Sequence, residues 1–129
     1  MCPFEVRQTF SVNQEVVTSF SDADGNLVRQ IVTGYLTTRL ENLSTGKTIH
    51  HNISGPATIT FETDQGFDGP FDIVGRGLGA QPFFPGDHPS STLLLFSGRA
   101  RLHMSGPPDF WVTLLSHTGD VTYLCALLA

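Results

Sequence analysis

The chain has 129 residues, of which 40% are hydrophobic, and a net charge of −5. That length fits a single domain with its own core, and the apolar fraction excludes a disordered chain. The seven basic residues are scattered, so we expect no nucleic-acid partner. No apolar run is long enough to cross a bilayer, so no transmembrane segment is expected. Residues 1–129 are therefore interpreted as one globular domain.

Alternation of apolar and polar side chains, the pattern of a half-buried strand, marks the N-terminal third. It predicts a strand from Phe4 to Val12 and a second over residues 15–20. The segment Asp22–Asn26 contains Asp-Gly, a strong hairpin signal. A long strand is expected from Leu27 to Leu43. Gly34 lies at its middle, where a barrel strand often has to bend.

Shorter strands are predicted in the middle of the chain, over Thr48–Ile53 and Ala57–Glu62. Residues 67–91 lack a regular pattern, apart from one short strand predicted over Phe71–Gly75. The segment Gln81–Pro89 is expected to be a loop, because its prolines cannot donate hydrogen bonds to a sheet.

The C-terminal third returns to alternation and short turns. Strands are predicted over Thr92–Phe96, Arg99–Met104, Phe110–Ser116 and Val121–Leu124. The whole chain then has about 8–10 strands and no crossover helices. This succession predicts an all-β domain, an antiparallel meander closing into a small β-barrel. A two-sheet β-sandwich is the alternative.

The only two cysteines lie at opposite ends of the chain, at Cys2 and Cys125. In a barrel with an even number of strands, the two chain ends meet at one rim, so these residues are predicted to form a disulfide. In the chain-entropy model, so long a loop stabilises by about 4–5 kcal/mol. The alternative is two buried free thiols.

The N-terminal residues bear on localisation. The start Met1-Cys2-Pro3 leads almost directly into a strand and has no signal-peptide pattern. We expect a secreted, extracellular protein from which the signal peptide has been removed. The alternative is a cytoplasmic protein that begins at Met1.

Catalytic and metal motifs are absent from the sequence. It has no Gly-x-Ser-x-Gly, no His-Glu-x-x-His and no cysteine pair at zinc spacing. Adjacent His50 and His51 would point to opposite faces of a strand. The acidic residues Glu62, Asp64, Asp68 and Asp72 are interpreted as a solvated loop, with a weak cation site as the alternative. No cofactor or metal is expected.

Four polar side chains share a strand face with apolar neighbours: Gln8, Gln30, Thr38 and His51. Each would need a partner in a solid core, because an unpaired buried polar group costs roughly 1–3 kcal/mol. Together they could instead line a ligand cavity, since a small barrel can hold one small ligand. The alternative is that Gln8, Gln30 and His51 bond to one another or to bulged backbone.

Four phenylalanines fall in or beside the irregular segment: Phe67, Phe71, Phe83 and Phe84. If exposed, they would form an apolar patch of a size that monomers usually avoid. They could cover a barrel mouth as a lid and contact the ligand, close the end of the core, or bind a partner.

Several segments carry a resemblance: Cys2, Asp24–Asn26, Asn42–Lys47, Asn52–Gly55 and Leu124–Leu128. Through them the chain resembles a group of small, uncharacterised secreted β-domain proteins of high-GC Gram-positive bacteria. The resemblance implies secretion and the terminal disulfide, and assigns no functional residue. In architecture the chain is also similar to barrels of the allene oxide cyclase type. Some of those bind lipids and some cyclise polyketides, but fold does not fix function.

Three functions remain open on this basis. The favoured one is a secreted barrel that binds a small apolar molecule in its interior, oriented by Gln8, Gln30 and His51. The second is a structural or interaction domain with a solid core, possible as an oligomer. The third is a cyclase or isomerase without a metal, in which His51 acts as general acid or base.

Overall fold

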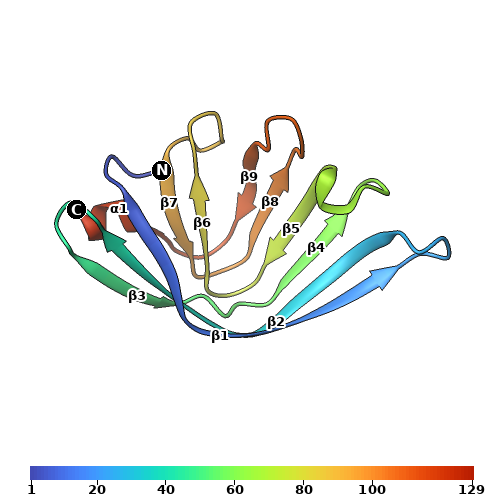
Figure 1. Cartoon of the computed structure of the whole chain (residues 1–129), viewed down its shortest axis with the longest axis horizontal. Helices are drawn as coiled ribbons and strands as arrows, with labels where there is room; N and C mark the ends of the chain where they lie inside the picture. The colour runs from blue at the N-terminus through green and yellow to red at the C-terminus, as the bar shows by residue number, and fades with distance from the viewer.

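The computed structural model describes all 129 residues, and nearly all of its regular structure is antiparallel β-sheet (Figure 1). This confirms the predicted fold class. The elements follow in the order β1 (Val6–Ser21), β2 (Leu27–Asn42), β3 (Thr48–Asn52), β4 (Ala57–Phe61), a 3₁₀ turn (Gly66–Asp68), β5 (Phe71–Gly75), β6 (Gly79–Phe83), β7 (Thr92–Phe96), β8 (Ala100–Met104), β9 (Val112–His117), β10 (Val121–Tyr123) and α1 (Leu124–Leu128).

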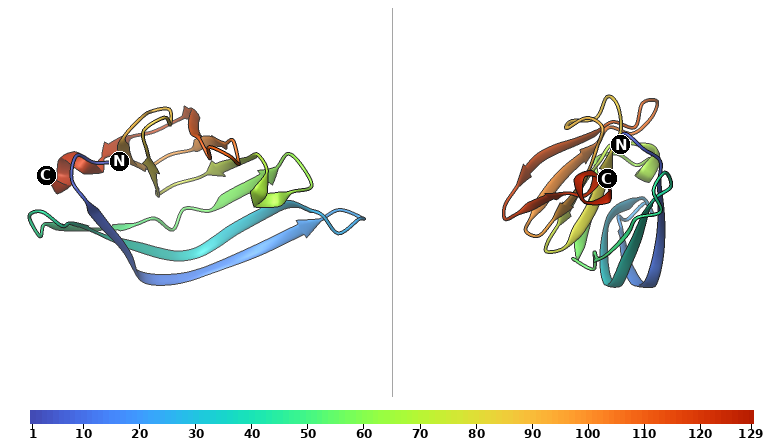
Figure 2. Two further views of the ribbon diagram at one scale, coloured as in Figure 1. Left: turned by 45° about the horizontal axis from the view of Figure 1, so that its top comes forward. Right: turned by 90° about the vertical axis from the view of Figure 1, so that its left-hand side faces the viewer.

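The strands form two sheets, and neither closes on itself. The larger sheet has seven strands in the order β1-β2-β4-β5-β8-β9, and β3 also pairs with β2. The smaller sheet has the order β10-β7-β6. The chain leaves the larger sheet at Gly75 and enters the smaller one at Gly79. The last strand therefore pairs with β7 rather than with β1, which leaves the sheet open (Figure 2). The predicted barrel closure is not seen.

The N-terminal hairpin is the longest feature of the molecule. Strand β1 is continuous, where the alternation predicted two separate strands, and a bulge between Phe10 and Val12 reverses the alternation. The predicted hairpin turn is confirmed, because a carboxylate oxygen of Asp22 accepts hydrogen bonds from the backbone N–H groups of Asp24 and Asn26. Gly25 there has a φ of 82°, which favours glycine.

Strand β2 pairs with two different strands along the edge that faces away from β1. Its C-terminal part pairs with β3 and its N-terminal part pairs with β4. Between these parts Gly34 has a φ of +104°, and a Cβ there would collide with the backbone carbonyl of Gln14. The sheet bends in this region (Figure 1), as the position of Gly34 predicted.

Strand β6 corrects one prediction. The segment Gln81–Pro89 was expected to be a loop throughout, yet Gln81, Pro82 and Phe83 pair with β7. Strand β6 lies at the edge of its sheet, so Pro82 can occupy it without interrupting a central ladder.

The two chain termini are fastened together. A disulfide joins Cys2 to Cys125, with 5.4 Å between their Cα atoms, as predicted. Helix α1 packs its Leu124 and Leu128 into a cluster with Leu40, Leu93 and Leu95. No helix in the structure has the length and apolar character needed to cross a bilayer.

A second cluster fills the space between the sheets further along. It consists of Phe83, Leu94, Phe96, Ala100 and Leu102, with Ile73 and Leu114 packed against it. Together the two clusters contain most of the 16 buried residues of the chain. The core is therefore small, and much of the larger sheet has no second layer over it.

Candidate functional site

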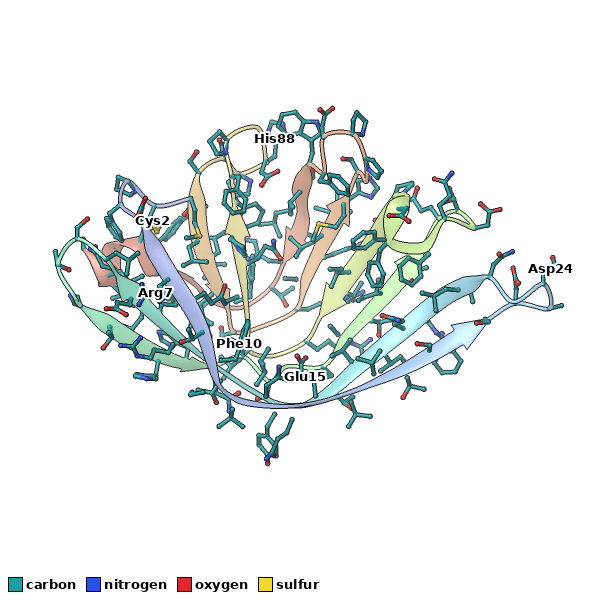
Figure 3. The ribbon with its side chains drawn as sticks, in the orientation of Figure 1. Cys2, Arg7, Phe10, Glu15, Asp24 and His88 are labelled. Atoms are coloured by element: carbon teal, nitrogen blue, oxygen red, sulfur yellow. A yellow bond between two sulfur atoms is a disulfide. The ribbon has the colours of Figure 1, made fainter.

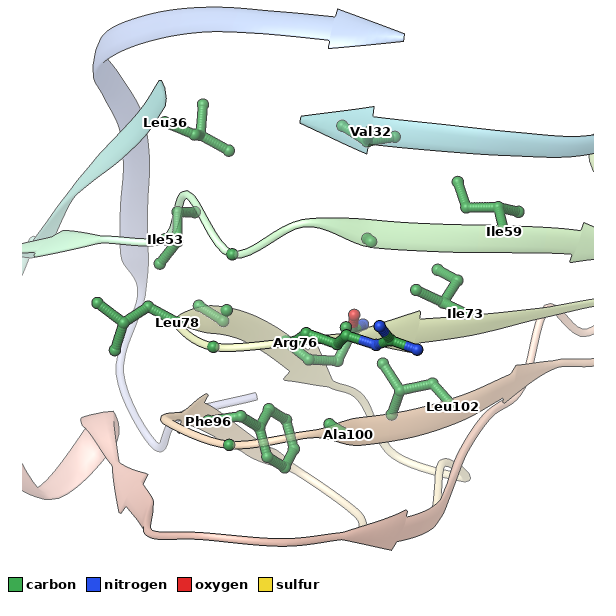
Figure 4. Close-up of a pocket in the computed structure, with 18 of the residues that line it drawn as sticks. Val32, Leu36, Ile53, Ile59, Ile73, Arg76, Leu78, Phe96, Ala100 and Leu102 are labelled. Carbon is green, nitrogen blue, oxygen red and sulfur yellow. The ribbon is translucent and has the colours of Figure 1, made fainter. Parts of the chain in front are cut away.

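A cavity of about 220 Å³ lies between the larger and the smaller sheet. Its wall is mainly apolar: 11 of its 19 lining residues are hydrophobic. Figure 4 shows side chains from both sheets converging on it. The apolar lining is Val32, Leu36, Ile53, Ala57, Ile59, Ile73, Leu78, Ala80, Phe96, Ala100 and Leu102.

Glycines create much of this space. Five of them line the cavity: Gly55, Gly75, Gly77, Gly79 and Gly98. A Cβ added at Gly75 or Gly79 would meet no atom within 4 Å. Gly55 has a different role, because a Cβ there would collide with the backbone of Arg76 and Leu78. The cavity is therefore open at Gly75 and Gly79, which have no side chains to fill it. At Gly55 the backbone of one segment packs closely against that of Arg76 and Leu78.

Three polar side chains interrupt the apolar wall: Glu15, Arg76 and Gln81. Gln81 donates a hydrogen bond from Nε2 to the carbonyl oxygen of Pro82, at 2.9 Å. Glu15 and Arg76 lie outside the ion pairs of the structure, which join other residues. They can therefore offer charge and hydrogen bonds to a bound molecule.

The four polar residues predicted to face a ligand lie elsewhere. Gln8 donates to the hydroxyl of Thr38 at 3.1 Å, and Thr38 is fully buried and pairs across strands with His51. Gln30 donates to the hydroxyl of Ser19. The structure thus brings Gln8, Thr38 and His51 together, leaves Gln30 apart, and places none of the four in the wall of the cavity.

The four predicted phenylalanines take three different positions. Phe67 and Phe71 stack edge-on with each other and around Phe61, where they cap one end of the larger sheet. Phe83 is fully buried in the core. Phe84 is exposed and lines a separate, open groove. None of them lies against the cavity between the sheets.

The separate groove has an aromatic wall. It measures about 440 Å³ and is lined by Phe84, Phe110 and Trp111, together with Pro82, Pro85 and Asp109. Asp87 fixes its base, because its carboxylate accepts hydrogen bonds from the N–H groups of Phe84 and Val112. Both spaces are partly open to solvent, but the groove is the less apolar of the two, because only four of its nine lining residues are hydrophobic.

One cluster of side chains has the donor atoms of a metal site. Atoms of Glu62, Asp72 and His103 lie within 4.8 Å of one another, and Nδ1 of His103 lies 2.7 Å from Asp72 Oδ1 and 3.5 Å from Glu62 Oε1. Arg101 also contacts Asp72, at 3.4 Å. The three residues could hold a cation, but their mutual contacts already pair them. The cluster lies on the sheet face opposite the cavity, since Asp72 alternates with Ile73.

Comparison of the chain with family models, curated proteins and solved structures finds no match.

Sequence reasoning missed the lining residues because their position depends on how two sheets face each other. The signal that could have found them is the alternating series Gly75, Gly77 and Gly79. It lies where the chain passes from the larger sheet to the smaller one. Glycine in a strand often marks a place where a ligand or another backbone comes close.

Proposed function

We propose that this protein binds a small, mainly apolar molecule in the cavity between its two sheets. The observation that carries the proposal is the 220 Å³ space walled by apolar side chains and left open at Gly75 and Gly79. Ligand sites are typically concave and apolar, with a few polar groups that fix orientation. Arg76, Gln81 and Glu15 supply those groups here.

Burial of the ligand supplies the binding free energy in this proposal. Each square ångström of apolar surface removed from water contributes roughly 25 cal/mol. A small ligand fits best, because the space between the two sheets measures only about 220 Å³.

We further propose that the protein acts outside the cytoplasm. The Cys2–Cys125 disulfide supports this, because structural disulfides persist in oxidising compartments. A secreted binding module needs a fold that survives without chaperones, and the covalent link between its ends serves that need.

The test is titration with N-phenyl-1-naphthylamine, a neutral apolar fluorophore whose emission rises in an apolar site. We expect saturable binding to the unmodified protein. Gly75→Leu and Gly79→Leu each place a side chain into the open space, so each should weaken binding at least about tenfold. The matched control is Ala23→Leu, which adds an apolar side chain in the exposed hairpin turn and should leave binding unchanged.

The outcome that contradicts the proposal is binding that both glycine variants leave intact while circular dichroism shows them folded. Absence of saturable binding to the unmodified protein also contradicts it, and would favour the interaction domain. No observation favours the cyclase alternative, because His51 lies outside the cavity wall.

A further inference from the structure

Strand β1 has a free edge along its full length. It forms hydrogen bonds with β2 on one side only, and it runs for 16 residues from Val6 to Ser21. A long edge strand offers a row of unpaired N–H and C=O groups to another chain. Proteins protect such an edge with lysine, proline, a short strand, a β-bulge or a charge. Strand β1 contains neither lysine nor proline, and its bulge at Phe10/Val12 leaves the stretch from Val12 to Phe20 regular, with Glu15 as its one charge.

Every other sheet edge is short or partly covered. The loop at His88 covers β9, because its backbone N–H donates to Val112 and its carbonyl accepts from Leu114. Strand β6 contains Pro82, which has no N–H to donate. Strands β10 and β3 have only three and five residues. Strand β1 is therefore the one edge of this fold suited to pairing with another strand.

The side chains of β1 are apolar where the edge is free. Val12, Val16 and Phe20 lie on the outer face of the larger sheet, opposite the cavity, because they pair with Thr37, Thr33 and Arg29 rather than with cavity residues. Their exposed fractions lie between 38% and 59%. Beyond the bulge, Glu15 is the only charged residue of the strand.

The total surface also exceeds that of a compact monomer. It measures 7265 Å², whereas a chain of 14.0 kDa is expected to expose about 6,700 Å². The excess of roughly 570 Å² is smaller than the roughly 800 Å² that each subunit buries in a standard dimer, so an edge-to-edge contact here would be a small interface.

We propose that β1 pairs antiparallel with β1 of a second copy of this chain, about a two-fold axis at Val16. In this register Val16 lies opposite its own copy and Val12 lies opposite Phe20, so all three apolar residues of the outer face meet apolar partners. Cross-strand apolar pairs stabilise a sheet, whereas like charges opposite each other destabilise it. An axis at Glu15 would set two carboxylates opposite each other.

The contact is isologous, so it closes at two copies and joins the two larger sheets into one. The outer face lies away from the cavity, so the contact reaches the cavity wall only at Glu15, which belongs to the pairing strand. Glu15 lines the cavity and points to the concave side in Figure 3. In the proposed register it lies opposite Val17 of the second copy.

The first measurement is the mass of the purified protein by analytical ultracentrifugation at micromolar concentration. We expect twice the 14.0 kDa of the chain. Val16→Lys places two positive charges at the axis and should raise the dissociation constant at least about tenfold. Leu115→Lys is the matched control, because Leu115 is an exposed apolar residue of β9 and lies outside the contact. A monomer, or a ring of three or more copies, overturns the proposal.

The second measurement tests the register by cross-linking. Residues directly opposite in an antiparallel pair have Cα atoms about 4.5–5.5 Å apart, within the reach of a disulfide. Val16→Cys should therefore form a covalent dimer under mild oxidation. Thr18→Cys lies on the same face but opposite Gln14 of the second copy, so it should stay uncrosslinked. The reverse pattern, or equal cross-linking of the two variants, overturns the proposed axis.

Discussion

The two ends of the β1–β2 hairpin differ sharply in burial, although the same two strands run through both. We name residues 6–10 with 38–42 the clasped end, and residues 12–21 with 27–37 the free end. At the clasped end Thr38, Leu40 and Asn42 are at most 1% exposed. Strand β1 is exposed at both ends apart from the half-buried Val6, so the difference lies in β2, which has no buried residue at the free end.

The difference comes from what lies over each end. Helix α1 and strand β7 cover the clasped end, and Leu124 and Leu128 pack there against Leu40. Val32 and Leu36 of the free end face the cavity, but toward the hairpin tip no segment of the chain covers it, and it extends away from the rest in Figure 1. Alternation along a strand therefore determines which side chains share a face of the sheet, but it does not determine whether another segment packs over that face.

The largest effect is expected from the covalent link at the clasped end. Replacing both cysteines, as Cys2→Ser with Cys125→Ser, should lower the free energy of unfolding by about 4–5 kcal/mol in the chain-entropy model, because the closed loop is long. Urea denaturation measures this. The unmodified protein under reducing conditions is the control and should reach the same midpoint. A loss below about 1 kcal/mol would contradict the importance of the link.

The next largest effect is expected at Leu40, which is buried in the same cluster. Leu40→Ala should lower the free energy of unfolding by about 2–5 kcal/mol, because it removes buried methyl groups and leaves a cavity. Thermal and urea unfolding both report the change. A loss under about 1 kcal/mol would mean that the cover over the clasped end is loose.

A smaller effect is expected at Asn42. Its Nδ2 donates a hydrogen bond to the carbonyl of Leu128 at 2.9 Å, and its Oδ1 accepts one from the N–H of Ser44. Asn42→Ala should cost about 1–3 kcal/mol, because the carbonyl of Leu128 is left without this partner. Ser44→Ala keeps both bonds of Asn42 and serves as control. Equal losses in the two variants would contradict the role of the Asn42 side chain.

The smallest effect is expected at the free end, on the inner face near the hairpin tip. Val28 is 39% exposed, so Val28→Ala should change the free energy of unfolding by no more than about 0.5 kcal/mol. Val28 lies away from the β1 edge, so self-association does not enter. A loss comparable with that of Leu40→Ala would show that the free end is covered in solution.

Much of the fold could be predicted from local chemistry. The alternation located the strands, and Asp-Gly located the hairpin turn at Asp22–Asn26. The pairing of Cys2 with Cys125 followed from the expected meeting of the chain ends. Closure could not be predicted in this way, because it depends on which strands meet at the far edge of a sheet. That choice is made between segments more than a hundred residues apart.

The candidate site was harder to predict than the fold. Polar groups on apolar faces were expected to mark the site, and Gln8 and Thr38 are such groups, but they form a hydrogen bond with each other. The cavity instead arises where side chains are missing, at Gly75 and Gly79. Glycine has no side chain and so does not contribute to the alternation of apolar and polar residues. The space at a glycine can be recognised only when the arrangement of the two sheets is known.

The disulfide between the two ends has a consequence for proteolysis. Because Cys2 and Cys125 are bonded, almost the whole chain is a covalent ring. A protease that cuts once in the exposed turn Asp22–Asn26 opens the ring but releases no fragment. The cut molecule keeps its mass, apart from the added water, until the disulfide is reduced. The long, exposed hairpin can therefore be nicked at its tip while all parts of the protein stay joined.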